Sequence, residues 1–276
     1  MSHFVVLVFG EPDDLEAQLE PYNENTEMPP YWEDETTDMT AHWCWSTVSE
    51  EAVVPITTME EYATALVKRY EADETDKYRV RKGVLQRQTT YNPQSQWDWW
   101  TVGGRWRGLL LTKDGRTVDE ARIADVDWEG MQTAARTKAE DSFDLMWNII
   151  GKREKLIAWT VFREKYPDDI PRAREEYNAQ ETLQVLRTSR ISVWEDPAKA
   201  FCLNDPDPRA AYIQSCVDAV PFCYAMVQDG VWGAMGRMGW WGMSKDDMTD
   251  AEWKKIVRAT IEANPEGYVT AVDCHI

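Results

Sequence analysis

The chain has 276 residues, 43% of them hydrophobic, and its 15 tryptophans add to the apolar surface that a large core can bury. Its formal net charge is −19, and residues 1–76 hold 19 acidic residues against two basic ones. This charge disfavours direct binding of nucleic acid through its phosphates. The five cysteines form no Cys-x-x-Cys pair, which argues against a disulfide framework and a structural zinc site.

The start of the sequence lacks the basic segment and long apolar run of a secretory signal. No stretch approaches the ~20 consecutive apolar residues of a membrane-spanning helix. We therefore expect a cytoplasmic protein that does not bind membranes.

The first predicted element is a strand over residues 4–9, an uninterrupted apolar run bounded by glycine and proline. Residues 11–38 are acidic, contain proline and have no clear period, so we expect mostly loop there. Thr58 and Glu61 have the spacing of a capping box, which predicts the start of a helix that ends near residue 71.

The middle of the chain is predicted to change from strands to helices. Residues 92–106 form a loop that leads into a β-hairpin over 107–118, with the turn at an Asp-Gly pair. A helical region follows over about 129–166, broken near a glycine, and a further helix over 171–187 begins at a proline. Residues 195–210 are rich in Asp and Pro and are predicted to be irregular.

The last third returns to strands. A second hairpin is predicted over 222–235, again with an Asp-Gly turn, followed by a capped helix over 249–264 and a closing strand over 268–275. These elements predict an α+β fold with a mainly antiparallel sheet that includes both chain termini and has helices packed on it. We expect a single domain over 1–276, with a helical insertion at about 129–190.

The first candidate site is the aromatic and glycine-rich loop. Its tryptophans can stack on a planar group, its paired glycines let backbone amides approach a ligand, and its arginine suits a phosphate or carboxylate. The aspartate can orient the arginine, hold a ribose hydroxyl or help bind a cation. The alternative is an ordered turn closed by an internal Asp–Arg ion pair. The candidate ligand-binding residues are Trp97, Asp98, Trp99, Gly103, Gly104 and Arg105.

The second candidate site joins the two ends of the chain. In a strand, alternation places Asp273 and His275 on one face, away from their apolar neighbours. If the first and last strands are neighbours, His3 lies beside them, and the three side chains form a general-base or metal constellation. The alternative is structural, because a histidine fixed by a nearby carboxylate is common in folded proteins.

A third segment, residues 236–243, contains Trp240 and Trp241 among glycines and an arginine, like the first loop. The two loops either face one pocket or pack on each other. His42 and the Trp43-Cys44-Trp45 run are further candidates for the same cluster. The acidic surroundings of Cys44 disfavour a nucleophilic role, because they raise the pKa of a thiol.

Five segments form a combination found together in other proteins: Met1-Ser2-His3-Phe4, Trp97-Asp98-Trp99, Gly103-Gly104-Arg105-Trp106, Gly239-Trp240-Trp241-Gly242 and Val272-Asp273-Cys274-His275-Ile276. Together they resemble an uncharacterised family of accessory proteins encoded by tailed bacteriophages and prophages. The resemblance covers both ends and the middle of the chain, whereas the acidic segment and the helical middle contribute little. It implies a phage or prophage accessory protein made in the bacterial cytoplasm, and it implies no activity or cofactor.

Two functions remain open from the sequence. In the first, the protein binds a nucleotide or another phosphorylated small molecule and hydrolyses or modifies it, with His3, Asp273 and His275 as acid–base groups. In the second, it is a non-catalytic interaction protein whose acidic first third acts as a decoy for a basic, nucleic-acid-binding host protein.

Overall fold

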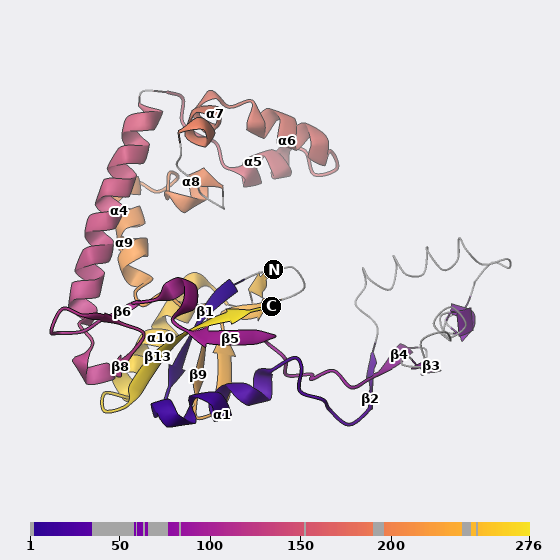
Figure 1. The fold of residues 1–276 in the computed structure, drawn as a ribbon. Coiled ribbons are helices and arrows are strands. Elements are labelled where there is room, and N and C mark those ends of the chain that lie inside the picture. Colours follow the sequence, from indigo (N-terminus) through magenta and orange to yellow (C-terminus); the bar gives the residue numbers. More distant parts are fainter. Residues whose placement is uncertain are drawn as a thin grey trace.

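The computed structural model describes residues 3–34, 58, 60–62, 64–65, 77–82, 84–151, 153–189, 196–238, 244–246 and 248–276. A mixed sheet forms one half of the molecule, and an arm of helices rises from it and bends over at its tip (Figure 1). A smaller three-stranded sheet lies to one side of the main sheet.

The main sheet is built around the two terminal strands. Its strand order is β10-β9-β1-β13-β5, and β8 also pairs with β13. The central strand β1 runs antiparallel to β13 and parallel to β9. The predicted α+β fold with both termini in the sheet is therefore confirmed. The strands are β1 (His3–Phe9), β5 (Trp99–Val102), β8 (Glu120–Arg122), β9 (Ala225–Gln228), β10 (Val231–Ala234) and β13 (Tyr268–His275).

Each face of the sheet has its own apolar core. On one face, α10 (Asp250–Ala263) buries Trp253, Val257 and Ile261 against alternate residues of β1 and β13. The capping box predicted for this helix is present, with Thr249 and Glu252 exchanging hydrogen bonds. On the other face, the short helix α1 (Leu15–Leu19) contributes its two leucines. Because both faces of the sheet are covered, apolar and polar residues do not alternate along β1, and its apolar run is buried throughout.

Small strands and single turns complete this half. The Asp-Gly hairpin is present as β6 and β7, and the second hairpin as β9 and β10, as predicted. Two expected loops were wrong in part. Residues 11–38 contain α1 and β2, and residues 92–106 contain β5. The remaining elements are η1 (Pro12–Asp14), η2 (Glu20–Tyr22), η3 (Gly104–Trp106), η4 (Ile123–Asp125), β2 (Tyr31–Asp34), β3 (Lys77–Arg81), β4 (Val84–Thr89), β6 (Leu110–Leu111), β7 (Thr117–Val118), β11 (Gly236–Met238) and β12 (Ser244–Asp246).

Thr58 and Glu61 exchange the two hydrogen bonds of the predicted capping box. Most of the helix expected to follow them lies outside the described residues.

The helical arm, defined here as α4 to α9, has a separate apolar core formed by residues such as Phe143, Leu156 and Leu183. The predicted break near residue 151 is present, because Gly151 ends α4 with a φ of 62°. The expected insertion over 129–190 remains a prediction about domain organisation. The single helix expected over 171–187 is two helices, Ile170–Asn178 and Glu181–Thr188. Two further arm helices were not predicted, and both begin within residues 195–210, which were expected to be irregular. The helices are α4 (Trp128–Ile150), α5 (Trp159–Lys165), α6 (Ile170–Asn178), α7 (Glu181–Thr188), α8 (Pro197–Ala200) and α9 (Pro208–Asp218).

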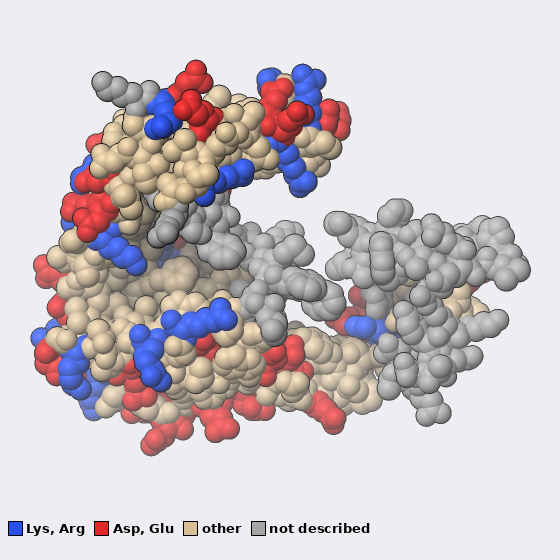
Figure 2. Space-filling model, turned by 45° about the horizontal axis from the view of Figure 1, so that its top comes forward, with Lys and Arg blue, Asp and Glu red and all other residues tan. Residues whose placement is uncertain are grey.

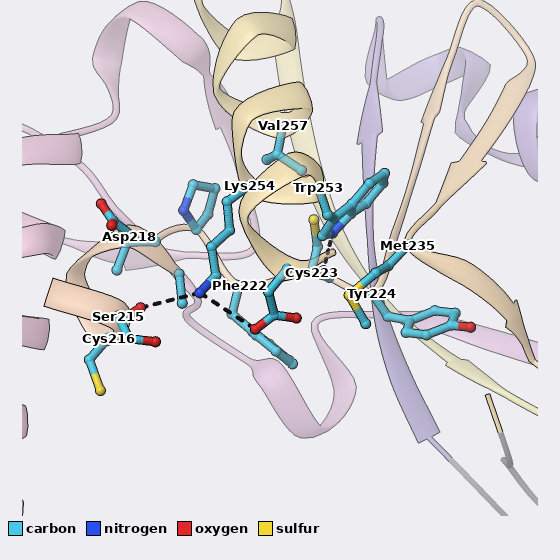
Figure 3. A pocket seen from close by; sticks show the side chains of 14 residues that line it. Ser215, Cys216, Asp218, Phe222, Cys223, Tyr224, Met235, Trp253, Lys254 and Val257 are labelled. Atoms are coloured by element: carbon cyan, nitrogen blue, oxygen red, sulfur yellow. Dashed lines mark hydrogen bonds and ion pairs between the residues drawn. The ribbon is translucent and has the colours of Figure 1, made fainter. Parts of the chain in front are cut away.

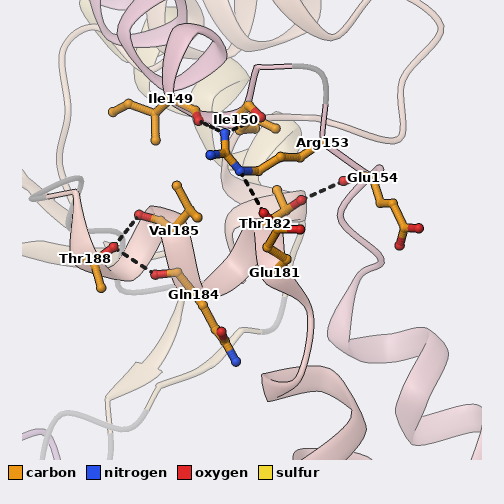
Figure 4. Close-up of polar contacts among 9 residues, drawn as sticks. All are labelled: Ile149, Ile150, Arg153, Glu154, Glu181, Thr182, Gln184, Val185 and Thr188. Carbon is orange, nitrogen blue, oxygen red and sulfur yellow. Dashed lines mark hydrogen bonds and ion pairs between the residues drawn. The ribbon is translucent and has the colours of Figure 1, made fainter.

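Polar contacts hold the end of α4 against α7 (Figure 4). Arg153 donates to the carbonyl oxygens of Ile149 and Ile150, which α4 leaves without helical partners, and pairs with Glu181 at 3.3 Å. The Thr182 hydroxyl donates to the Glu154 carbonyl at 2.7 Å. These contacts fix the turn from which the tip of the arm continues.

Candidate functional site

The pairing of the terminal strands brings the two predicted histidines together. In the register of β1 and β13, His3 lies opposite His275, and Val5 lies opposite Asp273. His3, Asp273 and His275 project from one face of the sheet, whereas Cys274 packs in the core of the other face. The alternation predicted for the last strand therefore places these three side chains as expected.

Strand β5 adds residues to the same place. It pairs with the outer edge of β13, so that Trp99 lies opposite His275 and Thr101 opposite Asp273. The backbone N–H of Asp98 donates to the carbonyl of His275 at 3.0 Å. This pairing fixes Asp98 and Trp99 beside the histidines, although the sequence predicted a loop there.

The first imidazole–carboxylate pair, here called the inner pair, consists of His3 and Asp273. Nδ1 of His3 lies 2.8 Å from Oδ1 of Asp273, and the side chains are 12% and 2% exposed. The other carboxylate oxygen of Asp273 accepts a 2.9 Å hydrogen bond from the backbone N–H of Arg105. A carboxylate so deeply buried requires such partners, because an unpaired buried charge is costly.

The second pair, here called the outer pair, consists of His275 and Asp98. Nδ1 of His275 lies 2.6 Å from Oδ1 of Asp98, and the side chains are 7% and 28% exposed. The sequence did not predict this partnership. Recognising Trp99–Val102 as a strand would have been the signal for it, because pairing of that strand with β13 places Asp98 beside His275.

The two imidazoles and one indole form a compact aromatic group. The ring centroids of His3 and His275 are 5.0 Å apart, with the planes inclined at 72°. Trp99 stacks on His275 at a centroid distance of 5.4 Å and meets His3 edge-on at 5.3 Å. Trp99 is 42% exposed, so part of its ring remains open to solvent. The arrangement keeps the two imidazoles close while each retains its own carboxylate.

Of the paired glycines, Gly104 approaches Asp273 closely, and Gly103 uses its amide within the fold. Gly104 has a φ of 50°, and a Cβ atom at this position would lie 2.4 Å from Cβ and Oδ2 of Asp273. The N–H of Gly103 donates to the carbonyl of Ala271 at 2.8 Å. At Gly104 the close approach that glycine allows therefore serves an internal carboxylate. A role of Gly103 and Gly104 in ligand binding stays a prediction.

The remaining predicted residues differ in their positions. Trp97 is 3% exposed and packs in the core, so the stacking role predicted for it does not fit, whereas Trp99 is accessible. Arg105 is exposed, and its guanidinium makes no hydrogen bond or ion pair with the described residues. The alternative internal pair between Asp98 and Arg105 is absent from this part of the structure, because Asp98 binds His275.

Trp240 and Trp241 lie outside the described residues, as do His42 and the 43–45 run. In the described ranges, no group of three or more His, Cys, Asp or Glu side chains is arranged to hold a metal ion. None of the described helices combines the length and apolar character needed to cross a bilayer.

Comparison of the chain with protein-family models, with curated proteins and with solved structures gives no match. The site is therefore interpreted from its own chemistry: two imidazoles, each oriented by a carboxylate, beside an exposed indole and an exposed guanidinium.

Proposed function

We propose that the protein binds a nucleotide or a related phosphorylated small molecule at the histidine site and hydrolyses its phosphoester by general acid–base catalysis. His3 and His275 are the proton-transferring groups in this proposal. Asp273 and Asp98 act as positioning residues, because each holds the Nδ1 atom of one imidazole. The observation that carries the proposal is the pair of neighbouring imidazoles, each with its own carboxylate.

The hydrogen bonds at Nδ1 determine which ring nitrogen is left for a substrate. When Nδ1–H donates to a carboxylate, Nε2 of a neutral imidazole carries the lone pair and can accept a proton. In the protonated imidazole, Nε2–H can donate one. A carboxylate at Nδ1 also fixes the orientation of the ring and stabilises its protonated form, which is how aspartate supports histidine in hydrolases.

Two such rings provide both proton transfers of a hydrolysis. One neutral imidazole takes a proton from water at Nε2 as the water oxygen forms a bond to phosphorus. The other, protonated imidazole gives its Nε2 proton to the ester oxygen as the phosphorus–oxygen bond breaks. Protons balance, because one is taken up and one is released, and each transfer of this kind contributes roughly 10²–10⁴-fold in rate.

The surrounding side chains suit a phosphorylated ligand with a planar base. The exposed part of Trp99 offers a stacking surface, and base–aromatic stacking tolerates any base. The backbone of Arg105 lies at the site, because its N–H donates to Asp273. The exposed guanidinium can form a bidentate contact with phosphate oxygens.

The test is hydrolysis of a panel of nucleoside mono-, di- and triphosphates and cyclic nucleotides. We expect His3→Ala and His275→Ala each to lower kcat by roughly 10²-fold or more. Arg105→Ala should chiefly raise KM. The matched control is Arg107→Ala, an exposed arginine two residues away, which should leave both constants unchanged. Absence of hydrolysis and of ligand-dependent thermal stabilisation across the panel would reject the proposal.

A second candidate function is the acidic decoy for a basic host protein. Exposed carboxylates surround α1, and Figure 2 shows acidic side chains along the lower edge of the sheet-bearing half. In this case, capture of a host protein from lysate should weaken as salt rises. Reversing the charge at Asp13, Asp14 and Glu16 should abolish capture, whereas the histidine variants should not affect it.

A further inference from the structure

A separate cavity of about 270 Å³ lies between the end of α9, the following loop and the first half of α10 (Figure 3). It shares no residue with the histidine site. Its walls are mainly apolar and include Pro221, Phe222, Met235, Trp253 and Val257. Phe222 is 56% exposed, which leaves an aromatic ring at the edge of the cavity available to a ligand.

The shape of the cavity is fixed by buried contacts behind it. The indole N–H of Trp253 donates to the carbonyl of Cys223 at 2.8 Å, which ties α10 to the loop. Burial raises the pKa of the Cys223 thiol to about 12, so this group stays neutral and adds to the apolar wall. Trp253 and Cys223 are therefore held in place within the cavity wall.

One cation, Lys254, reaches into the cavity with weak partners. Its side chain is only 19% exposed, and Nζ lies 3.7 Å from Oδ2 of Asp250 and 3.4 Å from the carbonyl oxygen of Ser215. By contrast, the neighbouring Arg258 pairs with Asp218 at 2.6 Å. An ammonium group has three donors and prefers acceptors within about 3 Å, so Lys254 retains capacity for an anionic partner.

The nearby carboxylates do not cancel this preference. Asp218 is neutralised by its close contact with Arg258. The side chain of Asp250 is 73% exposed, so water screens its charge. Figure 3 shows the amino group of Lys254 contacting Ser215 at the cavity wall.

We infer that this cavity binds a small organic carboxylate whose apolar tail lies against Phe222, Trp253 and Val257 and whose head group accepts hydrogen bonds from Lys254. A volume of about 270 Å³ corresponds to the space of roughly nine water molecules, which is enough for a short apolar chain or a single ring. This site is independent of the proposed hydrolysis at the histidines.

The experiment is calorimetric titration of the full chain with octanoate, octanol and octylamine. Each probe is kept below the concentration at which it forms micelles or separates from solution. These probes share one tail and differ only in the head group. We expect octanoate to bind most tightly, and Lys254→Gln to weaken its binding by about tenfold or more. Phe222→Ala should also weaken it, through lost apolar contact.

The matched control is Lys255→Gln, which removes an exposed lysine next in sequence and should leave octanoate binding unchanged. Circular dichroism establishes that each variant is folded. The inference is overturned if octanoate fails to bind the wild-type protein at millimolar concentration. Equal binding of octanol or octylamine, or equal effects of the two lysine variants, would overturn it as well.

Discussion

The inner and outer pairs contain the same chemical groups but differ in how the fold supports them. Asp273 of the inner pair is nearly inaccessible and accepts hydrogen bonds from both His3 and the Arg105 backbone, whereas Asp98 of the outer pair is 28% exposed at the sheet edge. The orientation of His3 therefore depends on a carboxylate of an interior strand, whereas that of His275 depends on a carboxylate beside an edge strand. We therefore expect substitutions at the inner pair to affect the whole fold and those at the outer pair to act locally.

The largest effect is expected for Asp273→Ala. Removing this carboxylate leaves Nδ1 of His3 and the N–H of Arg105 without their partner in a buried place, which costs about 3 kcal/mol of unfolding free energy. Urea unfolding followed by tryptophan fluorescence measures the loss. A smaller loss than that of Asp98→Ala would contradict the comparison.

Gly104→Ala tests the support behind the inner pair. A methyl group here would clash with Asp273 at 2.4 Å in a backbone conformation that alanine disfavours, so we expect a loss of about 2 kcal/mol. Gly115→Ala is the control, because Gly115 also has a positive φ but open space around its added Cβ. That variant should lose only about 1 kcal/mol. Equal losses would show that the contact with Asp273 contributes nothing.

Asp98→Ala is expected to cost less, about 1 kcal/mol, because its carboxylate is partly solvated and water can replace it at the imidazole. The same urea titration measures it. Under the proposed function, this variant should nevertheless lower kcat while the stability changes little. Unchanged kcat would show that Asp98 does not position His275 for catalysis.

Cys274 reports local opening of β13 at either pair. Burial, together with the charge of Asp273, raises the pKa of this thiol well above its usual range, so it should resist alkylation at pH 8 in the folded protein. Asp273→Ala should increase the alkylation rate at Cys274 more than Asp98→Ala does, as measured by peptide mass spectrometry. Equal rates in the two variants would mean that both pairs stabilise the strand alike.

The smallest effect is expected in the helical arm, at Glu176. Two hydrogen bonds hold the pKa of this carboxyl below its usual value. The one from Lys165 has the larger effect, and the one from Tyr166 the smaller. A depressed folded-state pKa contributes stability above the unfolded pKa, and this contribution is lost as the pH falls through the folded value. Glu176→Gln should therefore lose part of the acid sensitivity of the arm, seen by circular dichroism between pH 7 and 3. If the acid response of the arm is unchanged in this variant, the hydrogen bonds of Glu176 do not contribute to its pH-dependent stability.

Local patterns in the sequence predicted much of the sheet. The apolar run of β1, the two Asp-Gly hairpins and the capping box of α10 each carry their own signal, and the alternation in β13 placed Asp273 and His275 on one face. These features depend on residues close in sequence, so they can be predicted without knowing which distant segments are in contact.

The rest of the site depends on partners distant in sequence. Strand β5 has four residues, and only its pairing with β13 distinguishes it from the loop around it. The glycine turn has the composition of a ligand-binding loop, but its anion is the chain's own Asp273. Sequence spacing does not distinguish an internal carboxylate from a bound phosphate, because both require the same close backbone approach.

The position of β13 has a consequence for folding kinetics. This strand contacts β1, β5 and β8, and its pairing with β1 joins residues about 270 positions apart. Closing so long a segment costs chain entropy before any of these contacts is gained. We therefore expect slow, cooperative refolding in which the arm acquires structure first and both histidine pairs form together in the last, rate-limiting step.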